Sequence, residues 1–368
     1  MRTDFLIVGA GFAGCVFAER AARQAGCQVL LVEHRSHIGG NAYDYYNEDG
    51  ILVQKYGPHI FHTNSEKVWN YLSQFTEWNN YVHRVLASVN GKEVYLPINI
   101  DTMEKLCERT FTVETLKEYF EKRRVKVDKI KNSRDVIVSQ IGREIYELFF
   151  KNYTKKQWGV YPEELAPEVT SRLTVRFDRD TRYFADSYQG IPKYGYTRLF
   201  EKMLDNKNLH LLLNTDYKEI MNSVKFDKLI FTGPIDYYFD YMYGRLPYRS
   251  LDFKFEVLET ERYQNAGVVN YPNDHDYTRI AEFKHFYLQR HPKTAICYEY
   301  PKSEGTPYYP IPRAENYEIY HKYKEEAGKL NNVCFVGRLA EYKYLNMDQV
   351  VEEALKVFRD IKQNKLRR

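Results

Sequence analysis

Apolar residues near the start of the chain gather into two short runs, at 5–8 and 29–32, and both runs predict buried strands. The alanine-rich segment between them predicts a helix. Three glycines, Gly9, Gly11 and Gly14, stand where the first strand gives way to that helix. The chain therefore opens with a predicted strand, turn, helix and strand, which is the repeating unit of α/β domains.

The pattern turns helical from about residue 101 and stays so to about residue 160. We place Asp101 and Glu104 as the N-cap and N3 residues at the start of this stretch, and Ser133 as the cap of a later helix. The middle of the chain is therefore expected to form a helical module.

Apolar and polar residues alternate with period two after Arg172, most clearly at 253–257 and 297–300. This alternation predicts an antiparallel sheet. Residues 333–336 predict a short buried strand that runs through Gly337 into a last helix. We expect that strand and helix to rejoin the N-terminal unit, so that the fold class is α/β with a discontinuous first domain.

Composition narrows the class of protein. The chain has 368 residues, of which 43% are hydrophobic and 28% charged, which is typical of a folded protein with more than one domain. It has no apolar run long enough to span a membrane and no secretory signal, so we expect a cytoplasmic protein without membrane insertion. A net charge of only +4 argues against a nucleic-acid partner and leaves room for a local cationic pocket.

Cysteine and histidine spacing gives no sign of a metal site. The five cysteines are scattered, several of them within apolar runs, and are expected to be reduced core residues. His59 and His62 have a metal-like spacing, but no third ligand cluster accompanies them. Most of the 34 tyrosines should be half-buried packing residues, and a minority are candidates for a nucleotide or sugar pocket.

The glycine turn has the spacing of a dinucleotide-binding site. Gly9 permits the tight turn, Gly11 admits a pyrophosphate close to the backbone, and Gly14 lets helix and strand pack closely. Glu33, at the end of the next strand, is placed to accept hydrogen bonds from an adenosine ribose and to repel a 2′-phosphate. NAD and FAD share this fingerprint.

The segment 37–41 favours FAD, because a diglycine soon after the acidic residue resembles the FAD sites of glutathione-reductase-like and amine-oxidase-like flavoproteins. The chain carries one such fingerprint, whereas a reductase that also binds a pyridine nucleotide would be expected to carry two. We therefore expect FAD without a dedicated hydride exchange.

Several further segments resemble the UDP-galactopyranose mutase family, flavoenzymes that interconvert the pyranose and furanose rings of UDP-galactose. These segments are 55–64, 149–159, 188–192, 232–236, 248–251, 307–310 and 337–344. The resemblance implies attack of reduced flavin N5 on the anomeric carbon, a homodimer, and a product used for cell-surface polysaccharides. It also implies a Rossmann-like FAD-binding domain, an inserted helical bundle and an antiparallel β-sheet domain.

The expected domain boundaries combine this resemblance with the pattern along the chain. The FAD-binding domain takes residues 1–80, about 205–240 and 325–368. The helical bundle takes about 100–165, and the sheet domain takes about 80–100, 166–204 and 241–324.

The same resemblance assigns three sets of site residues. The catalytic residues are Arg172, Arg279 and His62. The substrate-binding residues are Phe149, Phe150, Tyr153, Trp158, Tyr183, Arg249, Asn270, Tyr309, Tyr344, Asn346, His59 and His83. The cofactor-binding residues are Gly9, Gly11, Phe12, Ala13, Gly14, Glu33, His34, Gly40, Asn41, His59, Arg338 and Met347.

Two positions depart from the family pattern. Asn346 stands where the bacterial family commonly has an aspartate, and with Gln349 it also has the spacing of an N-cap pair. His83 stands where close bacterial relatives are expected to have asparagine. These departures leave open whether UDP-N-acetylgalactosamine is also a substrate.

Two other classes of function share the FAD fingerprint. One is an FAD-dependent oxidoreductase of the amine-oxidase type, and the other is a nucleotide-sugar binder without catalysis. The sequence leaves open the physiological reductant, the downstream glycan and the oligomeric state beyond the family's homodimer.

Overall fold

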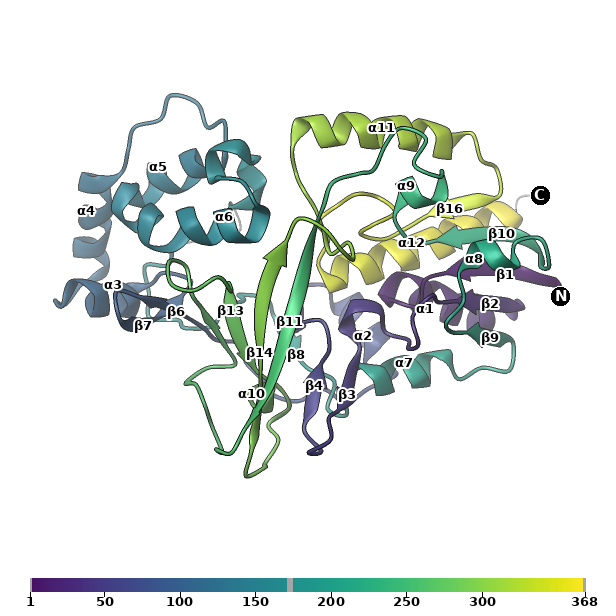
Figure 1. Ribbon diagram of the computed structural model, residues 1–368, viewed down its shortest axis with the longest axis horizontal. Coiled ribbons are helices and arrows are strands. Elements are labelled where there is room, and N and C mark those ends of the chain that lie inside the picture. Colours follow the sequence, from purple (N-terminus) through teal and green to yellow (C-terminus); the bar gives the residue numbers. More distant parts are fainter. Residues whose placement is uncertain (1, 171–174, 367–368) are drawn as a thin grey trace.

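Two sheets and a helical module organise the protein in the computed structural model, which describes residues 2–170 and 175–366 (Figure 1). One sheet has five strands in the order β16-β10-β1-β2-β9, and the other has seven strands in the order β15-β11-β14-β13-β12-β6-β7. The α/β class predicted from the sequence is confirmed.

The five-stranded sheet is parallel throughout. Its strands are β1 (Arg2–Val8), β2 (Val29–Val32), β9 (Leu209–Leu212), β10 (Lys225–Phe231) and β16 (Val333–Phe335). They come from three distant parts of the chain, so that the C-terminal strand does rejoin the N-terminal unit. That strand is half-buried and not buried as predicted, because it forms the edge of the sheet.

Three helices pack around one another beside this sheet. They are α1 (Phe12–Glu19), α7 (Tyr196–Leu204) and α12 (Met347–Leu366). The ring of Phe12 lies 4.7 Å from that of Phe200, and the ring of Phe17 lies 5.8 Å from that of Phe358. These edge-to-face contacts fix α1, and therefore the glycine turn that precedes it, against the rest of the domain.

The seven-stranded sheet is antiparallel apart from the parallel pair of β12 and β6. Its strands are β6 (Val85–Val89), β7 (Lys92–Leu96), β11 (Tyr248–Leu258), β12 (Val268–Asn270), β13 (Arg279–Glu282), β14 (Thr294–Lys302) and β15 (Tyr309–Pro310). Two short ribbons, β3 (Asp44–Tyr46) with β4 (Leu52–Gln54) and β5 (Phe61–Thr63) with β8 (Tyr188–Gly190), add to the framework.

A helical module lies at one end of the molecule, on the left in Figure 1. It contains α3 (Ile100–Cys107), α4 (Val113–Arg123), α5 (Ser133–Tyr146), the π-helical turn η3 (Glu147–Lys151) and α6 (Asn152–Trp158). The remaining helices are α2 (Glu66–Leu72), α8 (Tyr217–Ile220), α9 (Ile235–Tyr238), α10 (Phe283–Tyr287) and α11 (Ala314–Gly328). Short turns η1 (Arg20–Gln24), η2 (Gly40–Ala42), η4 (Pro162–Glu164) and η5 (Pro167–Val169) complete the helical structure.

Both predicted helix caps in this module are wrong by one or two residues. The N-cap of α3 is Asn99, whereas Asp101 lies within the first turn. The N-cap of α5 is Asn132, and Ser133 is the first helical residue. In each case an asparagine stands one or two residues before the predicted residue, and its side-chain oxygen accepts a backbone N–H at the helix start.

All five cysteines are free thiols, but only Cys15 and Cys297 are buried core residues as predicted, whereas Cys27, Cys107 and Cys334 are half-buried. Burial raises the pKa of Cys15 and of Cys297, so that both thiols stay protonated at neutral pH. Within the described residues, no helix is both long enough and apolar enough to cross a membrane.

Candidate functional site

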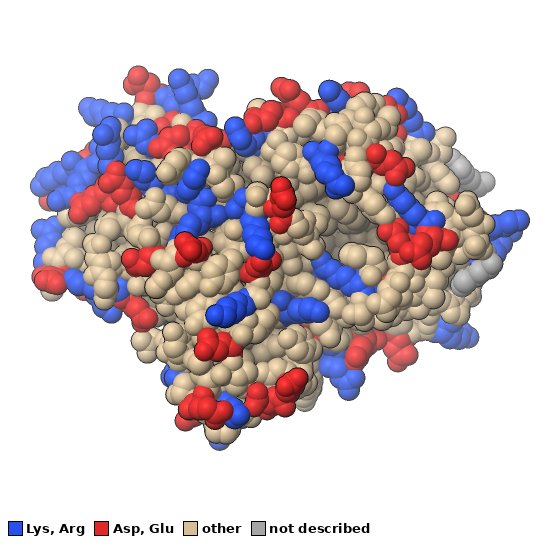
Figure 2. Space-filling model, in the orientation of Figure 1, with Lys and Arg blue, Asp and Glu red and all other residues tan. Residues whose placement is uncertain are grey.

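A cavity of about 1110 Å³ opens where the parallel strands end. Val8, Val32 and Phe231, the last residues of β1, β2 and β10, line it together with the glycine turn. The carboxyl ends of parallel strands are where open α/β sheets bind their ligands. The face drawn in Figure 2 is hollowed between the two sheets, beside the elements that line this cavity.

Two of the three glycines in the turn have no room for a side chain. A Cβ on Gly9 would lie 2.2 Å from Thr232 Oγ1, and the backbone there has φ +97°. A Cβ on Gly14 would lie 1.9 Å from the carbonyl oxygen of Gly9. A Cβ on Gly11 would lie only 3.7 Å from Gly40 Cα, so that two bare backbones face each other at the cavity wall. The predicted steric roles of Gly9 and Gly14 therefore hold in the structure.

Glu33 is held as a charged group at the end of β2. Its carboxylate accepts hydrogen bonds from the backbone N–H of Ala10 at 2.8 Å and of Arg35 at 3.0 Å, and His34 Nδ1 lies 2.9 Å away. Burial opposes the charged form, but these hydrogen bonds keep the pKa of Glu33 below its usual value. The carboxylate is thus oriented in the wall of the cavity.

The structure gathers the predicted cofactor residues in one place. All of them except Gly14 line the large cavity: Gly9, Gly11, Phe12, Ala13, Glu33, His34, Gly40, Asn41, His59, Arg338 and Met347. Gly14 packs against the turn instead. The backbone N–H of Asn346 donates to Gln349 Oε1 at 2.8 Å, which confirms the predicted capping pair at the start of α12.

A polar row crosses three neighbouring strands of the antiparallel sheet. Asn270 pairs with Arg279, and Arg279 pairs with Glu299 on the next strand. Residues directly opposite each other in antiparallel strands present their side chains on the same face. Arg279 donates from Nε and Nη2 to Glu299 Oε2, at 3.0 and 2.8 Å.

Two hydrogen-bond acceptors in this row have no donor among the described residues. Asn270 Oδ1 and Glu299 Oε1 are both buried, and neither has a hydrogen-bond partner there. A buried polar atom without a partner costs free energy, on the order of 1–3 kcal/mol. The two oxygens therefore favour a ligand that carries hydroxyl or N–H donors.

Arg279 is a permanent cation at the centre of the site. Burial disfavours its charge, but the Glu299 carboxylate and the neighbouring tyrosines Tyr153 and Tyr309 raise the pKa of Arg279 well above its usual value. In turn, burial raises the pKa of Tyr153 and of Tyr309, so that both remain hydroxyl donors. A cation ringed by hydroxyl donors is suited to phosphate oxygens.

A second, smaller cavity of about 60 Å³ lies between the helical module and the sheet. Five of the predicted substrate residues line it: Phe149, Phe150, Tyr153, Tyr183 and Asn270. Phe149 and Phe150 also belong to the core of the helical module, which confirms the helix-core interpretation, and their contact with substrate stays a prediction. Arg279 lines neither cavity, but its charge acts on His59, a residue of the large cavity, and on Tyr183, a residue of the small one.

Aromatic rings and a second guanidinium border the space beside Arg279. The ring of Trp158 lies 6.2 Å from Tyr309 and 6.0 Å from Tyr344, whose rings are 5.6 Å apart. The guanidinium carbon of Arg338 lies 5.5 Å from the Tyr309 ring and 5.3 Å from the Tyr344 ring. Four of the predicted site residues are therefore in mutual contact.

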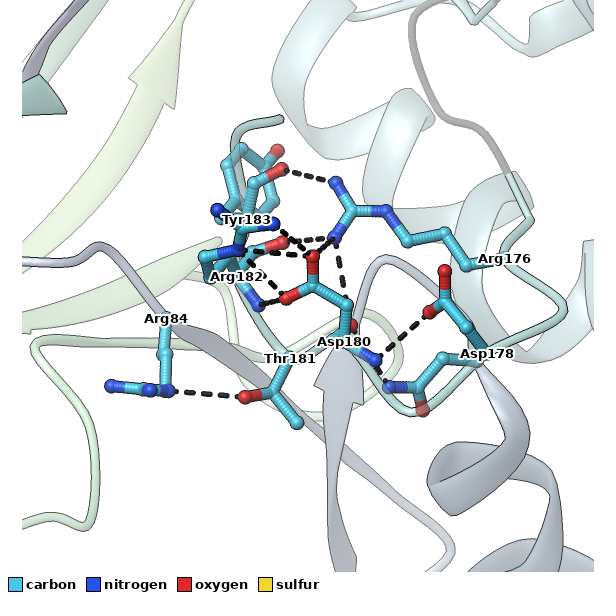
Figure 3. A network of polar contacts seen from close by, with 8 residues as sticks. Arg84, Arg176, Asp178, Asp180, Thr181, Arg182 and Tyr183 are labelled. Atoms are coloured by element: carbon cyan, nitrogen blue, oxygen red, sulfur yellow. Dashed lines mark hydrogen bonds and ion pairs between the residues drawn. The ribbon is translucent and has the colours of Figure 1, made fainter. Parts of the chain in front are cut away.

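Tyr183 is fixed by a turn that a network of charges stabilises (Figure 3). Arg182 and Asp180 form a bidentate ion pair, with Nη2 to Oδ2 at 2.7 Å. Arg176 reaches the backbone carbonyls of Arg182 and Tyr183. The backbone N–H of Tyr183 then donates to the carbonyl of His83 at 2.8 Å. The ring is thereby presented to the small cavity by a rigid turn.

Two predicted histidines are held neutral. Burial, and then the guanidinium groups of Arg338 and Arg279, lower the pKa of His59 to about 4. Because His59 Nδ1 lies 2.9 Å from the carbonyl of Gly57, it must donate there, which leaves Nε2 as an acceptor. Burial, with Arg279 and His62, lowers the pKa of His83 to about 3.

His83 lies within the protein and not on an open surface. Its Nδ1 is 2.9 Å from the hydroxyl of Tyr81, and its ring lies 5.6 Å from Phe184 in a near-parallel stack. Phe184 in turn stacks on His62 with a ring separation of 3.6 Å. His83 therefore shapes the site through its neighbours as well as by any direct contact.

His62 is oriented by a carboxylate. Its Nδ1 lies 2.9 Å from Asp186 Oδ2, and Asp186 Oδ1 accepts from Asn64 Nδ2 at 2.8 Å. This contact orients the imidazole ring. His62 is not among the residues that line the two cavities.

Two other arginines, Arg249 and Arg172, were predicted as site residues. Arg249 lines the large cavity, and it donates to the carbonyls of Gln157 at 2.9 Å and Lys156 at 3.1 Å. It therefore holds the C-terminal end of α6. Arg172 lies outside the described residues.

Glu299 and Asp186 were not predicted as site residues. Glu299 stands in an alternating strand at a position where its side chain points inward, and an acidic residue at a buried position of a strand is a signal of a paired charge. Asp186 gives no comparable signal, because it joins His62 from 124 residues away in the sequence.

These features define a class of protein. It is an α/β protein with a dinucleotide-type cavity at the ends of a parallel sheet and, next to it, a cationic and aromatic cavity on an antiparallel sheet. A family model described as UDP-galactopyranose mutase matches residues 148–344, and one described as an NAD(P)-binding Rossmann-like domain matches residues 7–75. The chain belongs to the UDP-galactopyranose mutase family.

Relatives of known name cover nearly the whole chain. A probable UDP-galactopyranose mutase from Klebsiella pneumoniae is 40% identical over 360 residues, which span 96% of this chain and 93% of the relative. A dTDP-fucopyranose mutase from Escherichia coli is 36% identical over 362 residues, which span 95% of this chain and 96% of the relative. The family resemblance seen in the sequence is confirmed, and with it the expectation of an enzyme.

Solved structures support the fold. A crystal structure of reduced UDP-galactopyranose mutase matches with a TM-score of 0.81 at 15% identity, covering 99% of this chain and 94% of that chain. A putative protoporphyrinogen oxidase from Exiguobacterium sp. 255-15 matches with a TM-score of 0.70 at 13% identity, covering 99% of both chains.

Proposed function

We propose that this protein interconverts UDP-galactopyranose and UDP-galactofuranose with FAD bound in its reduced form. The observation that carries the proposal is the polar row of Asn270, Arg279 and Glu299, which combines a fixed cation with two buried, unpartnered acceptors. A nucleotide sugar offers both matching groups, because its diphosphate is anionic and its sugar and base carry hydroxyl and N–H donors.

The large cavity fits FAD by the chemistry of its walls. The glycine turn leaves backbone exposed for a pyrophosphate, and the Glu33 carboxylate is oriented as an acceptor for a ribose. Reduced flavin, when bound, supplies a nucleophilic N5 for the anomeric carbon. The chain itself would bind and orient the nucleotide sugar beside it.

The work of the side chains is to hold UDP while the sugar ring changes. Arg279, with the hydroxyls of Tyr309 and Tyr183, would bind the diphosphate and stabilise the charge that develops when the bond to the sugar breaks. Tyr153 would stack on the uracil ring from the wall of the small cavity. Arg172 is proposed as a second phosphate ligand, on the family resemblance alone.

Proton movement needs groups that are neutral at working pH. His59 is such a group, because its lowered pKa keeps Nε2 free to accept a proton or hydrogen bond from a sugar hydroxyl. His62 lies with its ring oriented by Asp186. We propose that both lie beside the sugar when it is bound.

Three nucleotide sugars are candidates for the substrate. One relative is named as a mutase of dTDP-fucopyranose at 36% identity, close to the 40% of the UDP-galactopyranose relative. UDP-N-acetylgalactosamine is a further candidate, because His83 and Asn346 depart from the family pattern. We rank UDP-galactose first.

The test is an anaerobic assay of the flavin-loaded protein with three furanose substrates side by side. These are UDP-galactofuranose, its N-acetylated counterpart and dTDP-fucofuranose. The proposal expects the first to be converted to its pyranose form with the highest kcat/KM, and only after reduction of the flavin. No conversion of any of the three, with nucleotide still bound, would instead favour a binding protein.

We further propose that the protein acts in the cytoplasm as a homodimer and supplies precursors for cell-surface polysaccharides. The family resemblance supports the homodimer and the polysaccharide role, and the location is carried over from the composition of the chain. Sedimentation of the flavin-loaded protein tests the oligomeric state directly, and a single monomer boundary would refute the dimer.

A further inference from the structure

The ammonium group of Lys156 lies in a nest of backbone carbonyls. Lys156 belongs to α6, and its Nζ donates to the carbonyl oxygens of Asp274 and His275 at 3.2 Å, of Tyr277 at 3.1 Å, and of Tyr271. All four carbonyls belong to the loop 271–278, which connects β12 to β13. A lysine carries three N–H donors, so these four acceptors share its protons.

Other contacts fix the same helix to the same loop. Asn152, the first residue of α6, donates from Nδ2 to Asn273 Oδ1 at 3.0 Å, and Asn273 Nδ2 donates to the carbonyl of Leu148 at 2.9 Å. At the other end of α6, Arg249 donates to the carbonyls of Gln157 and Lys156. The helix is therefore attached at both ends and at its centre to elements about 90–120 residues away.

Residues that are predicted to contact the substrate lie within the helix and on both sides of the loop. α6 carries Tyr153 and Trp158. The loop begins directly after Asn270 and ends directly before Arg279. The position of α6 against this loop thus sets the distance between the ring proposed for uracil and the cation proposed for the diphosphate.

The ammonium is a charged group in a partly desolvated place. Burial lowers the pKa of Lys156 to about 8, although Asp274 and Asp276 oppose this effect. Carbonyl dipoles replace the water that the ammonium has lost, as they do around a dehydrated monovalent cation. A neutral, apolar side chain at this position would leave four carbonyls facing one another without a donor.

We propose that Lys156 is a positioning residue that holds α6 to the β12–β13 loop in the register that binds a uridine diphosphate sugar. This inference rests on the proposed function. It predicts that removal of the ammonium weakens the binding of UDP and raises KM, while kcat and the flavin content change little, because the cofactor cavity is built from other elements.

The first comparison is Lys156→Met against Lys155→Met, in flavin-loaded full-length protein. Lys155 is the adjacent lysine of α6, and its Nζ donates to the carbonyl of Gly159 in its own segment. Calorimetry with UDP should show a Kd raised by about tenfold or more in Lys156→Met and a Kd within about twofold of the unaltered protein in Lys155→Met.

A chemical rescue separates positioning from general packing. In Lys156→Ala, methylammonium chloride should restore part of the UDP affinity by entering the carbonyl nest, whereas tetramethylammonium chloride at equal concentration should not, since it has no N–H donor. A structural role in packing alone would be insensitive to the difference between these two salts.

The outcomes are distinct. Equal UDP affinity in Lys156→Met and the unaltered protein would overturn the positioning role and leave the proposed function intact. No UDP binding by the unaltered protein would refute both.

If Lys156→Met fails to fold, Asn152→Ala removes only the amide pair at the start of α6. A UDP Kd in that variant indistinguishable from the unaltered value would overturn the inference, and a rise of a fewfold would support it.

Discussion

At the scale of single residues, the arrangement of charges around Arg279 is decisive. Its guanidinium is bound by Glu299 and interacts electrostatically with Tyr153 and Tyr309. The ion pair orients the two donors that face Glu299, and the remaining N–H groups stay available for a ligand. A residue in this position serves stability and binding together, and the two roles are separable by experiment.

Replacement of Arg279 by alanine should destabilise the protein by about 3 kcal/mol, because it leaves the buried Glu299 carboxylate without a partner. It should also abolish most turnover while FAD remains bound. The double variant Arg279→Ala, Glu299→Gln should recover most of the stability and none of the turnover. Thermal unfolding and the mutase assay measure the two effects, and an active double variant would refute the phosphate-binding role.

Replacement of His83 by asparagine tests the low pKa of this buried histidine. The pKa of His83 is about 3 in the folded protein and near 6.5 in an unfolded chain. Below pH 6.5 the unfolded state therefore takes up a proton that the folded state does not, and stability is lost as the pH falls. Between about pH 6.5 and pH 5 this residue alone costs on the order of 2 kcal/mol.

His83→Asn should accordingly lose less stability than the unaltered protein over that interval, as measured by urea unfolding at several pH values. Exposed His210→Asn, on the edge strand β9, controls for the loss of a histidine as such. Parallel pH profiles for His83→Asn and the unaltered protein would contradict the assignment.

At the scale of elements, the sequence pattern predicted the glycine turn and the alternating strands, but it did not predict where helices begin. The glycine turn and the alternating strands are visible in the sequence because each depends on residues adjacent in the chain. The caps of α3 and α5 differ from the predicted ones because an asparagine stands one or two residues before each predicted cap and takes the same role. The break inside α5 at Gly142, with φ +85°, was not predicted, since a single glycine within a helical pattern is usually tolerated.

The tight packing of α1 against β1 gives a direct test of the glycine turn. Gly14→Ala places a Cβ against the carbonyl of Gly9, so α1 must move away from β1. We expect a loss of about 1–3 kcal/mol in stability and a protein purified largely without flavin. The flavin absorbance per protein and the unfolding midpoint are the two measurements.

Gly328→Ala is the matched control. Gly328 is the last residue of α11, and a Cβ there would meet no atom within 4 Å. The substitution should leave flavin content unchanged and should be neutral or stabilising by up to about 1 kcal/mol. Normal flavin loading in Gly14→Ala would show that the turn tolerates a side chain and would contradict the steric account.

At the scale of the whole molecule, the site is made by bringing distant segments together. The parallel sheet takes strands from both ends of the chain, and the charges of Arg338 and Arg279, from two different parts of the sequence, both act on His59 in the wall of the large cavity. The family resemblance could place most of these residues in one site. It could not show Glu299, Asp186 or the carbonyl nest of Lys156, because those contacts depend on the register of strands and loops that lie far apart in the sequence.

The central claim is that flavin acts without net oxidation or reduction of the substrate. The most direct measurement is an anaerobic reaction in which the bound flavin is photoreduced once, the reductant is removed, and excess UDP-galactofuranose is added. We predict many molecules of UDP-galactopyranose per flavin, with the flavin still reduced at the end. Product that stops at about one per flavin, while the flavin becomes oxidised in step, would contradict the claim and identify an oxidoreductase instead.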